Sequence, residues 1–125
     1  MAEYTLPQDD IDFIKNLLRQ GSVKWQGRAE CLRRARKRVM VRRSKTGQPI
    51  YKYHWQCASC RRWTKNEKLM EVDHIIEIGS FNGDWNLYVP RVFCGQDNLQ
   101  ALCVVCHLKK TKKFNSARTR WKRKR

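Results

Sequence analysis

Acidic residues are scarce in this sequence, and long apolar runs are missing. The chain has 11 Asp and Glu against 28 Lys and Arg, which gives a formal net charge of +17 at pH 7. No apolar run approaches the roughly 20 residues of a membrane-spanning helix. The N-terminus lacks the basic and apolar segments of a secretory signal peptide. We therefore expect an intracellular, cytoplasmic protein that has no membrane partner and keeps its thiols reduced.

The hydrophobic core is expected to be small. At 125 residues the chain has room for one compact domain. Its hydrophobic fraction of 41% includes Cys, Tyr and Trp, so the aliphatic part is modest. Domains of this size commonly need disulfides or a structural metal. Because disulfide frameworks belong to secreted proteins, the six cysteines favour a metal.

The positive charge predicts a polyanionic partner, which we expect to be DNA. Two basic blocks flank the cysteine-rich central region. Either block taken alone could be a solvated face. An anionic membrane is disfavoured because no basic stretch has an apolar face for insertion. The residues that we expect to contact phosphates are Arg33, Arg34, Lys37, Arg38, Arg42, Arg43, Arg61, Arg62, Lys109 and Lys110.

Hydrophobic periodicity and turn residues predict an α+β fold with helices before the core. The expected helices span about 10–20, 22–43, 85–93 and 99–113, and the expected strands span 50–55, 61–64 and 69–76. The basic face of the 22–43 helix would lie on a DNA backbone. Residues 1–8 and the last residues are expected to be unstructured. We divide the chain into a basic helical segment (1–49), a core (50–114) and a basic tail (115–125).

Four cysteines form two C-x-x-C pairs. They are Cys57, Cys60, Cys103 and Cys106. Each pair can chelate Zn²⁺ through one tight turn, and four thiolates suit tetrahedral coordination. Free core cysteines or a redox pair are the alternatives, but the thioredoxin-like context of a redox pair is absent. Cys31 and Cys94 belong to neither pair, and we expect them to be small core residues.

A second group of residues is suited to catalysis. Asp73 and His74 are neighbours on a predicted strand, so their side chains should face opposite sides. Asp73 and His107 could meet at a hard divalent cation, as a carboxylate and an imidazole ligand. His74 could then act as a general base, oriented by a hydrogen bond from Asn98. A lone histidine more often has a structural role, which we assign to His54.

These motifs occur together in a known order. Residues 50–113 resemble the zinc-stapled subgroup of HNH endonucleases. The motifs that carry the resemblance are C-x-x-C, Val-Asp-His-Ile, Asp-Asn-Leu-Gln-x-Leu-Cys-x-x-Cys-His and Lys-Lys-Thr. The resemblance implies a ββα-metal core stapled by a zinc site of four cysteines. It also implies that His74 activates water with the help of Asn98, while Asp73 and His107 bind the catalytic metal. Glu77 departs from the pattern, because many members have Pro there, and we expect it to face solvent rather than the metal.

The expected reaction is metal-dependent hydrolysis of a DNA phosphodiester, as a nick or a double-strand cut. The resemblance implies a 5′-phosphate and a 3′-hydroxyl product. Besides structural Zn²⁺, we expect catalytic Mg²⁺ or Mn²⁺, with Ni²⁺ or Co²⁺ tolerated. A single site cuts one strand at a time and no dimerisation heptad is visible, so we expect a monomer or a weak dimer.

A non-catalytic zinc-ribbon module that binds nucleic acid is the main alternative. It explains the charge and the four cysteines equally well, but not the presence of Asp73, His74, Asn98 and His107 in register. A third interpretation, a scaffold or adaptor at a phage packaging complex, is compatible with nuclease activity. Because small stand-alone HNH proteins are often phage-encoded, the resemblance implies a phage origin and a location in the host cytoplasm.

Overall fold

The structure is a computed structural model that describes the backbone of residues 5–123 and the side chains as far as residue 116. Its helices are α1 (Gln8–Ser22), α2 (Gln26–Ala35), α3 (Trp85–Val92) and α4 (Val104–Arg123), with 3₁₀ turns at Glu67–Leu69 and Gln96–Asn98. Its strands are β1 (Arg36–Arg43), β2 (Pro49–Gln56), β3 (Trp63–Thr64), β4 (Met70–His74) and β5 (Leu99–Cys103). This mixture confirms the predicted α+β class.

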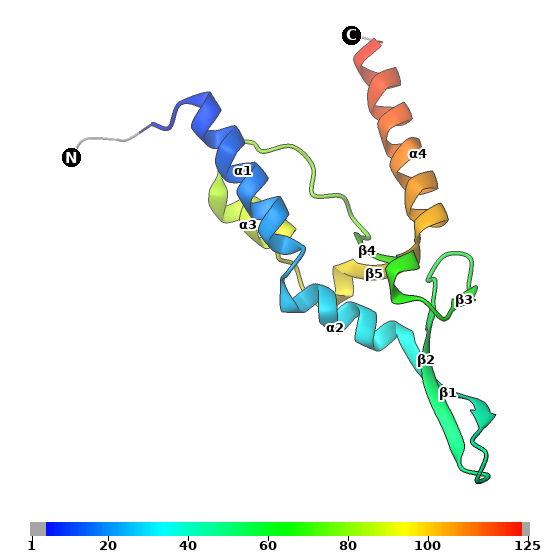
Figure 1. The fold of residues 1–125 in the computed structure, drawn as a ribbon. Coiled ribbons are helices and arrows are strands. Elements are labelled where there is room, and N and C mark those ends of the chain that lie inside the picture. Colours follow the sequence, from blue (N-terminus) through cyan, green and yellow to red (C-terminus); the bar gives the residue numbers. More distant parts are fainter. Residues whose placement is uncertain (1–4, 124–125) are drawn as a thin grey trace.

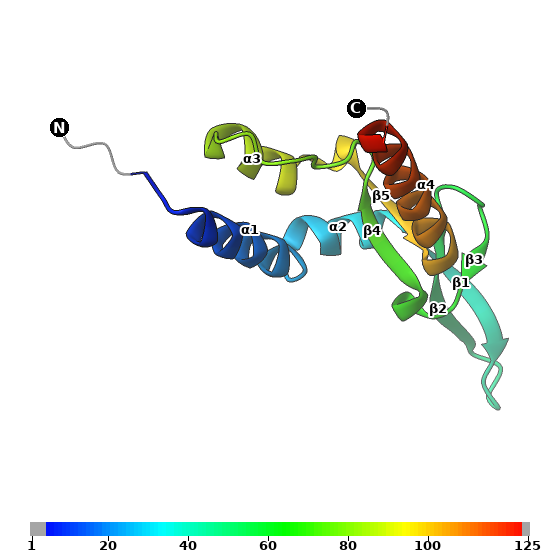
Figure 2. The ribbon, with the colours of Figure 1, turned by 90° about the horizontal axis from the view of Figure 1, so that it is seen from above.

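The antiparallel hairpin β4–β5 lies at the centre of the molecule, in contact with both α2 and α4 (Figure 2). Side chains alternate between the two faces of a strand. Met70 and Val72 therefore turn towards α2, while Glu71 and Asp73 face α4. The hairpin thus separates an apolar layer from a polar one.

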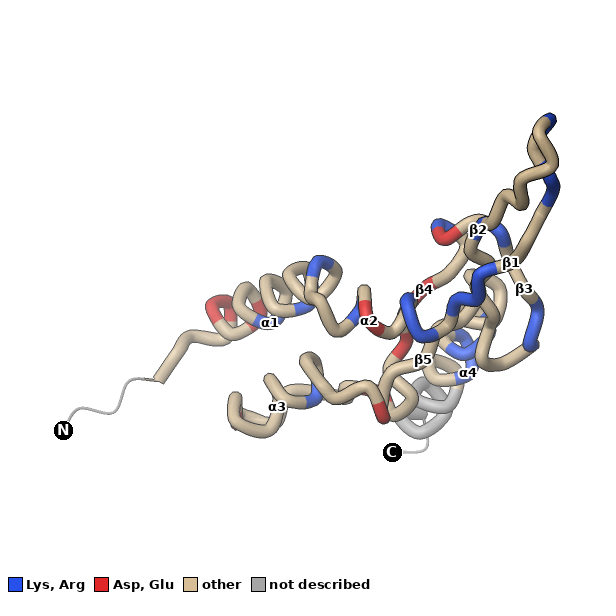
Figure 3. Tube along the Cα trace, turned by 90° about the horizontal axis from the view of Figure 1, so that it is seen from below, with Lys and Arg blue, Asp and Glu red and all other residues tan. Residues whose placement is uncertain are grey.

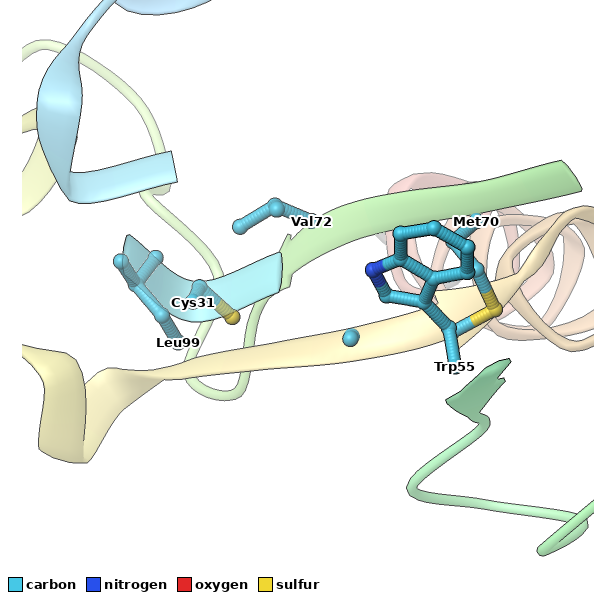
Figure 4. Packing of buried hydrophobic residues seen from close by; sticks show 6 residues of the cluster. Cys31, Trp55, Met70, Val72 and Leu99 are labelled. Atoms are coloured by element: carbon cyan, nitrogen blue, oxygen red, sulfur yellow. The ribbon is translucent and has the colours of Figure 1, made fainter. Parts of the chain in front are cut away.

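The hydrophobic core fills the apolar side of this hairpin (Figure 4). Trp55 of β2 packs at one end, and Cys31 of α2 packs with Leu99 at the other. Cys94 packs against the same cluster, and burial raises the pKa of the Cys31 thiol, which keeps it neutral. Both cysteines are core residues, as predicted.

A three-stranded sheet, β1-β2-β3, begins at this core and extends away from it as the long β1–β2 hairpin (Figure 1). The prediction of one helix over 22–43 is wrong, because α2 ends at Ala35 and residues 36–43 form β1. Closely spaced Lys and Arg repel one another along a helix, whereas a strand sends alternate ones to opposite faces. A turn closed by Gly47, with φ 84°, returns the chain into β2.

The prediction of a helix over 99–113 is also partly wrong. Residues 99–103 form β5, which pairs with β4 and buries Leu99, Ala101 and Leu102. The helix begins at Val104 and continues to Arg123, across the expected boundary of the basic tail. No Gly or Pro follows Gly95, and Lys and Arg are good helix formers. Residues 124–125 lie outside the described residues, and the division at 49 and 114 stays a prediction.

α1 and α3 form a side layer next to the core (Figure 2). Phe81 and Trp85 pack against each other at a tilt, and both meet the Tyr88 ring edge to face. Arg19 Nε donates to Tyr88 Oη at 3.2 Å. α3 lies where the sequence predicts a short helix. α1 begins at Gln8, inside the segment expected to be unstructured, while residues 1–4 lie outside the described part of the chain. Among residues 5–123, no helix has the length and apolarity needed to cross a membrane.

Candidate catalytic and metal sites

The four cysteines of the C-x-x-C pairs form one cluster, as predicted. Their Sγ atoms all lie within 4.8 Å of one another, and Cys60 Sγ is 3.9 Å from Cys103 Sγ. Four sulfurs bound tetrahedrally to Zn²⁺ at about 2.3 Å would be roughly 3.8 Å apart. The donor set and its spacing therefore fit a tetrahedral zinc ion. The Cys57–Cys60 turn is also fixed to β5, because the Ala58 amide donates to the Ala101 carbonyl at 2.9 Å.

The thiols of this cluster differ in acidity. Burial alone would raise the pKa of Cys57, but backbone amides of Cys103, Cys60 and Ser59 lower it to about 6. Hydrogen bonding to the Cys103 thiol, followed by burial, raises the pKa of Cys106 to about 11. Crowded thiolates repel one another, so complete deprotonation of the cluster requires a cation among them. The cluster could therefore hold a metal ion.

Asp73 and His107 meet on the α4 side of the β4–β5 hairpin. Asp73 Oδ1 lies 3.4 Å from His107 Nε2, and Asp73 is only 5% exposed. Two ligand atoms about 2.1 Å from one cation are separated by roughly 3 to 3.5 Å. His107 Nδ1 contacts the Glu71 carboxylate. Because a carboxylate accepts, Nδ1 donates, and in the neutral imidazole Nε2 keeps the lone pair that a metal needs.

Lys110 lies against the other oxygen of Asp73. Its Nζ is 2.5 Å from Asp73 Oδ2 and also donates to the His74 carbonyl. Gln100 Nε2 donates to the same Asp73 oxygen at 2.9 Å, which leaves Oδ1 directed at His107. Lys110, expected on phosphates, is thus engaged inside the protein. Glu77, expected to face solvent rather than the metal, is half-exposed and lies 3.4 Å from Lys110 Nζ.

The imidazole of His74 is oriented by α3. His74 Nε2 lies 2.9 Å from the backbone carbonyl of Val92, a fully buried residue at the end of that helix. A carbonyl oxygen can only accept, so Nε2 donates, and in the neutral imidazole Nδ1 is the nitrogen that carries the lone pair. The short helix α3 therefore orients the ring of His74.

Asn98 has a different partner from the one predicted. Its side chain exchanges two hydrogen bonds with the Ile76 backbone, accepting at 2.8 Å and donating at 3.3 Å. The backbone carbonyl of Asn98 accepts from the Ile75 amide at 2.9 Å. The predicted hydrogen bond to the His74 ring is replaced by these contacts, because the ring is turned towards α3. Asn98 holds the chain that leaves β4 directly after His74.

The expected phosphate-contacting residues occupy several surfaces (Figure 3). Arg33 and Arg34 extend from α2, where both pair with Glu30 at 2.6 and 3.1 Å. Lys37, Arg38, Arg42 and Arg43 lie on β1, Arg61 and Arg62 lie beside the cysteine turn, and Lys109 lies on α4. Lysines at 109, 110, 112 and 113 line a groove between α4 and β5. These residues lie on separate parts of the molecular surface and do not form a single patch.

Two residues beside Asp73 were missed in the sequence. Glu71 lies two positions before Asp73, so a strand places both carboxylates on one face. The two-residue period of a strand can be read from the sequence and could have indicated Glu71. Gln100 is paired directly with Asp73 across the hairpin, a relationship that depends on strand register. No local signal in the sequence specifies that pairing.

The chain is similar to a protein of known family. Over 59 residues it is 41% identical to a probable HNH endonuclease of Lactococcus phage SK1. The match covers 46% of this chain and 55% of the relative, so the chain spans about half the length of the curated relative it matches. No family model matches the chain, and no solved structure matches it. The partial match supports a relationship to the HNH family without distinguishing a cysteine-containing subgroup.

Proposed function

We propose that this protein is a metal-dependent HNH endonuclease that hydrolyses phosphodiester bonds in DNA. The observation that carries the proposal is the pairing of Asp73 with His107, next to His74 at the end of the same strand. The partial similarity to a probable HNH endonuclease supports a nuclease function in general. The order β4, β5, α4, with the four-cysteine cluster at the start of the helix, supports the proposal of a ββα-metal core.

Asp73 Oδ1 and His107 Nε2 would hold a divalent cation, which we take to be Mg²⁺ or Mn²⁺, with Ni²⁺ or Co²⁺ tolerated. When bound, the cation neutralises negative charge that develops on the phosphate. Glu71 keeps the Nε2 lone pair of His107 available, and Lys110 with Gln100 fixes the Asp73 carboxylate. The four cysteines would hold Zn²⁺ as a structural ion.

His74 Nδ1 is the proposed general base. A water proton moves to Nδ1 as the water oxygen bonds to phosphorus, and the bond from phosphorus to the 3′ oxygen breaks. The departing 3′ oxygen takes a proton from solvent water. This leaves a 5′-phosphate and a 3′-hydroxyl. The Val92 carbonyl holds the Nε2 proton in place throughout, so the ring enters the reaction as the correct tautomer. Asn98 fixes the backbone after His74 and thereby limits movement of the ring.

DNA is the proposed partner because lysines of α4 lie beside this site. The lysine-lined groove along α4 runs past Gln100, the residue that contacts Asp73. Binding through such side chains is largely independent of sequence and weakens steeply with salt. We propose a monomer or weak dimer that cuts one strand per event. An attachment to a phage packaging complex is compatible with this activity.

The test is incubation of supercoiled plasmid with purified protein and Mg²⁺ or Mn²⁺. Nicked or linear product is expected, and EDTA should prevent it. His74→Ala should reduce the rate by about 10²- to 10⁴-fold, the usual contribution of a general base, without loss of zinc or DNA binding. His54→Gln is the matched histidine control and should cut at the wild-type rate. A wild-type protein that binds DNA but never cuts it would favour the zinc-ribbon alternative.

A further inference from the structure

The β1–β2 hairpin is a basic arm that contributes little to the core. Residues 36–56 contain seven Lys and Arg and no Asp or Glu. Between Arg36 and Trp55, no residue of the hairpin is buried. The arm extends from the rest of the molecule, with most of its positive residues along β1 and the turn and Lys52 on β2 (Figures 1 and 3). Its charge and exposure are explained by a partner rather than by packing.

One face of the arm alternates cations with aromatic rings. The strand register places Arg36 opposite Trp55, Arg38 opposite Tyr53 and Met40 opposite Tyr51 on this face. The Arg36 guanidinium lies 3.9 Å from the Tyr53 ring centroid, and the Arg38 guanidinium lies 4.1 Å from that of Tyr51. We call this set of residues the Arg–Tyr face.

Beyond the buried Trp55 at its base, the Arg–Tyr face is open, while the opposite face is partly covered. Tyr51 and Tyr53 are 44% and 43% exposed. On the opposite face, Lys37 and His54 line a shallow cavity with Trp63 of β3. Stacking holds each guanidinium extended but leaves its N–H groups free to donate. The Arg–Tyr face is therefore the side available to a ligand.

The shape of the arm fits duplex DNA. The major groove, about 12 Å wide, admits a two-stranded β-ribbon. Eight residues per strand at about 3.3 Å each give an arm of roughly 26 Å, long enough to cross that groove. The register shifts between Met40 and Arg42, and such a bulge increases the twist of a ribbon. Arg42 and Arg43 lie beyond this bulge, near the tip of the arm and close in sequence to Lys45.

We propose that the β1–β2 hairpin is a duplex-binding arm that enters the major groove with its Arg–Tyr face. Arg36 and Arg38 donate to base edges, and Arg42 and Arg43 contact the flanking phosphates. The arm fixes the protein on DNA, whereas the Asp73–His107 region performs the reaction. The identity of the partner rests on the proposed function, but binding by the arm does not require cleavage.

The experiment measures binding of a fluorescent 25-base-pair duplex by anisotropy in EDTA, so that no cleavage occurs. The double variant R36Q/R38Q should weaken binding by about tenfold or more, since an arginine on a base edge contributes about one to two powers of ten. The control K52Q/K65Q removes the same charge from exposed lysines outside the Arg–Tyr face and should lose about threefold or less, as expected for charge alone. Equal losses in both double variants would overturn the proposal.

Two further measurements separate the arm from the active site and identify the groove. At saturating duplex with Mg²⁺, R36Q/R38Q should cut at the wild-type rate, whereas His74→Ala should bind normally without cutting. If the wild type binds but never cuts, the nuclease proposal fails and the arm is still tested by binding. A major-groove dye should displace the protein and a minor-groove ligand should not. The reverse result, or tighter binding to single-stranded DNA, would overturn the proposal.

Discussion

Asp73 Oδ1 lies 3.4 Å from His107 Nε2, although a long connection separates the two residues in sequence. The register of β4–β5 explains the contact, because Asp73 pairs with Gln100 and α4 begins directly after β5. One turn of that helix carries His107 back over β4. Cys103 and Cys106 lie at this same junction, so the cysteine cluster fixes the helix that presents His107.

Replacement of Glu71 should weaken binding of the catalytic cation. Glu71 contacts His107 Nδ1 and sets its tautomer. Loss of such a partner typically lowers metal affinity by about 10- to 100-fold. Glu71→Ala should show this loss in Mn²⁺ titrations followed by electron paramagnetic resonance, with Glu71→Gln intermediate. Glu67→Ala is the control, and an unchanged Mn²⁺ affinity for Glu71→Ala would contradict the assigned role.

Removal of the Lys110 ammonium should destabilise the fold. The Asp73 carboxylate is buried, and Lys110 Nζ is its nearest positive group at 2.5 Å. Lys110→Met should lower the free energy of unfolding by about 1 to 3 kcal/mol, as for a buried acceptor that loses its donor. Lys109→Met is the neighbouring control on α4. Urea unfolding curves that coincide for the two variants would show that Lys110 is not a structural donor.

Asn98→Ala should loosen the segment after His74. Three hydrogen bonds connect Asn98 to Ile75 and Ile76, and two of them use its side chain. We expect faster amide exchange at Ile76 and a reduced cleavage rate with little change in DNA affinity. Asn86→Ala on α3 provides the control. An exchange rate at Ile76 equal to that of the wild type would contradict this role.

Cys57→Ser should remove the bound zinc and the cooperative unfolding transition. Cys57 is fully buried among the other three thiols, and structural zinc stabilises small domains directly. Native mass spectrometry should find one zinc per wild-type chain and none in the variant. Cys31→Ala should keep the metal, because Cys31 lies in the apolar core. A zinc-free Cys57→Ser protein that still melts cooperatively would contradict a structural role of the site.

The β1 segment shows why helical spacing alone misled the prediction. Residues 25, 29, 32 and 35 follow a helical stripe, and α2 indeed covers most of them. The stripe extends to Val39 and Met40, but these residues pair with Lys52 and Tyr51 instead. Short apolar runs fit either period, so a distant partner strand decides between them. The same reason explains why β5 was predicted as helix.

The sequence by itself determined the cysteine cluster, the different directions of the Asp73 and His74 side chains, and the basic character of the chain. These follow from short spacings and from charge, which do not depend on distant contacts. Tertiary structure alone decided that Val92 orients His74, that Asn98 binds the Ile76 backbone and that Lys110 forms an ion pair with Asp73. Each of those contacts joins residues far apart in sequence. Strand register and helix packing set such contacts, and neither is encoded in local spacing.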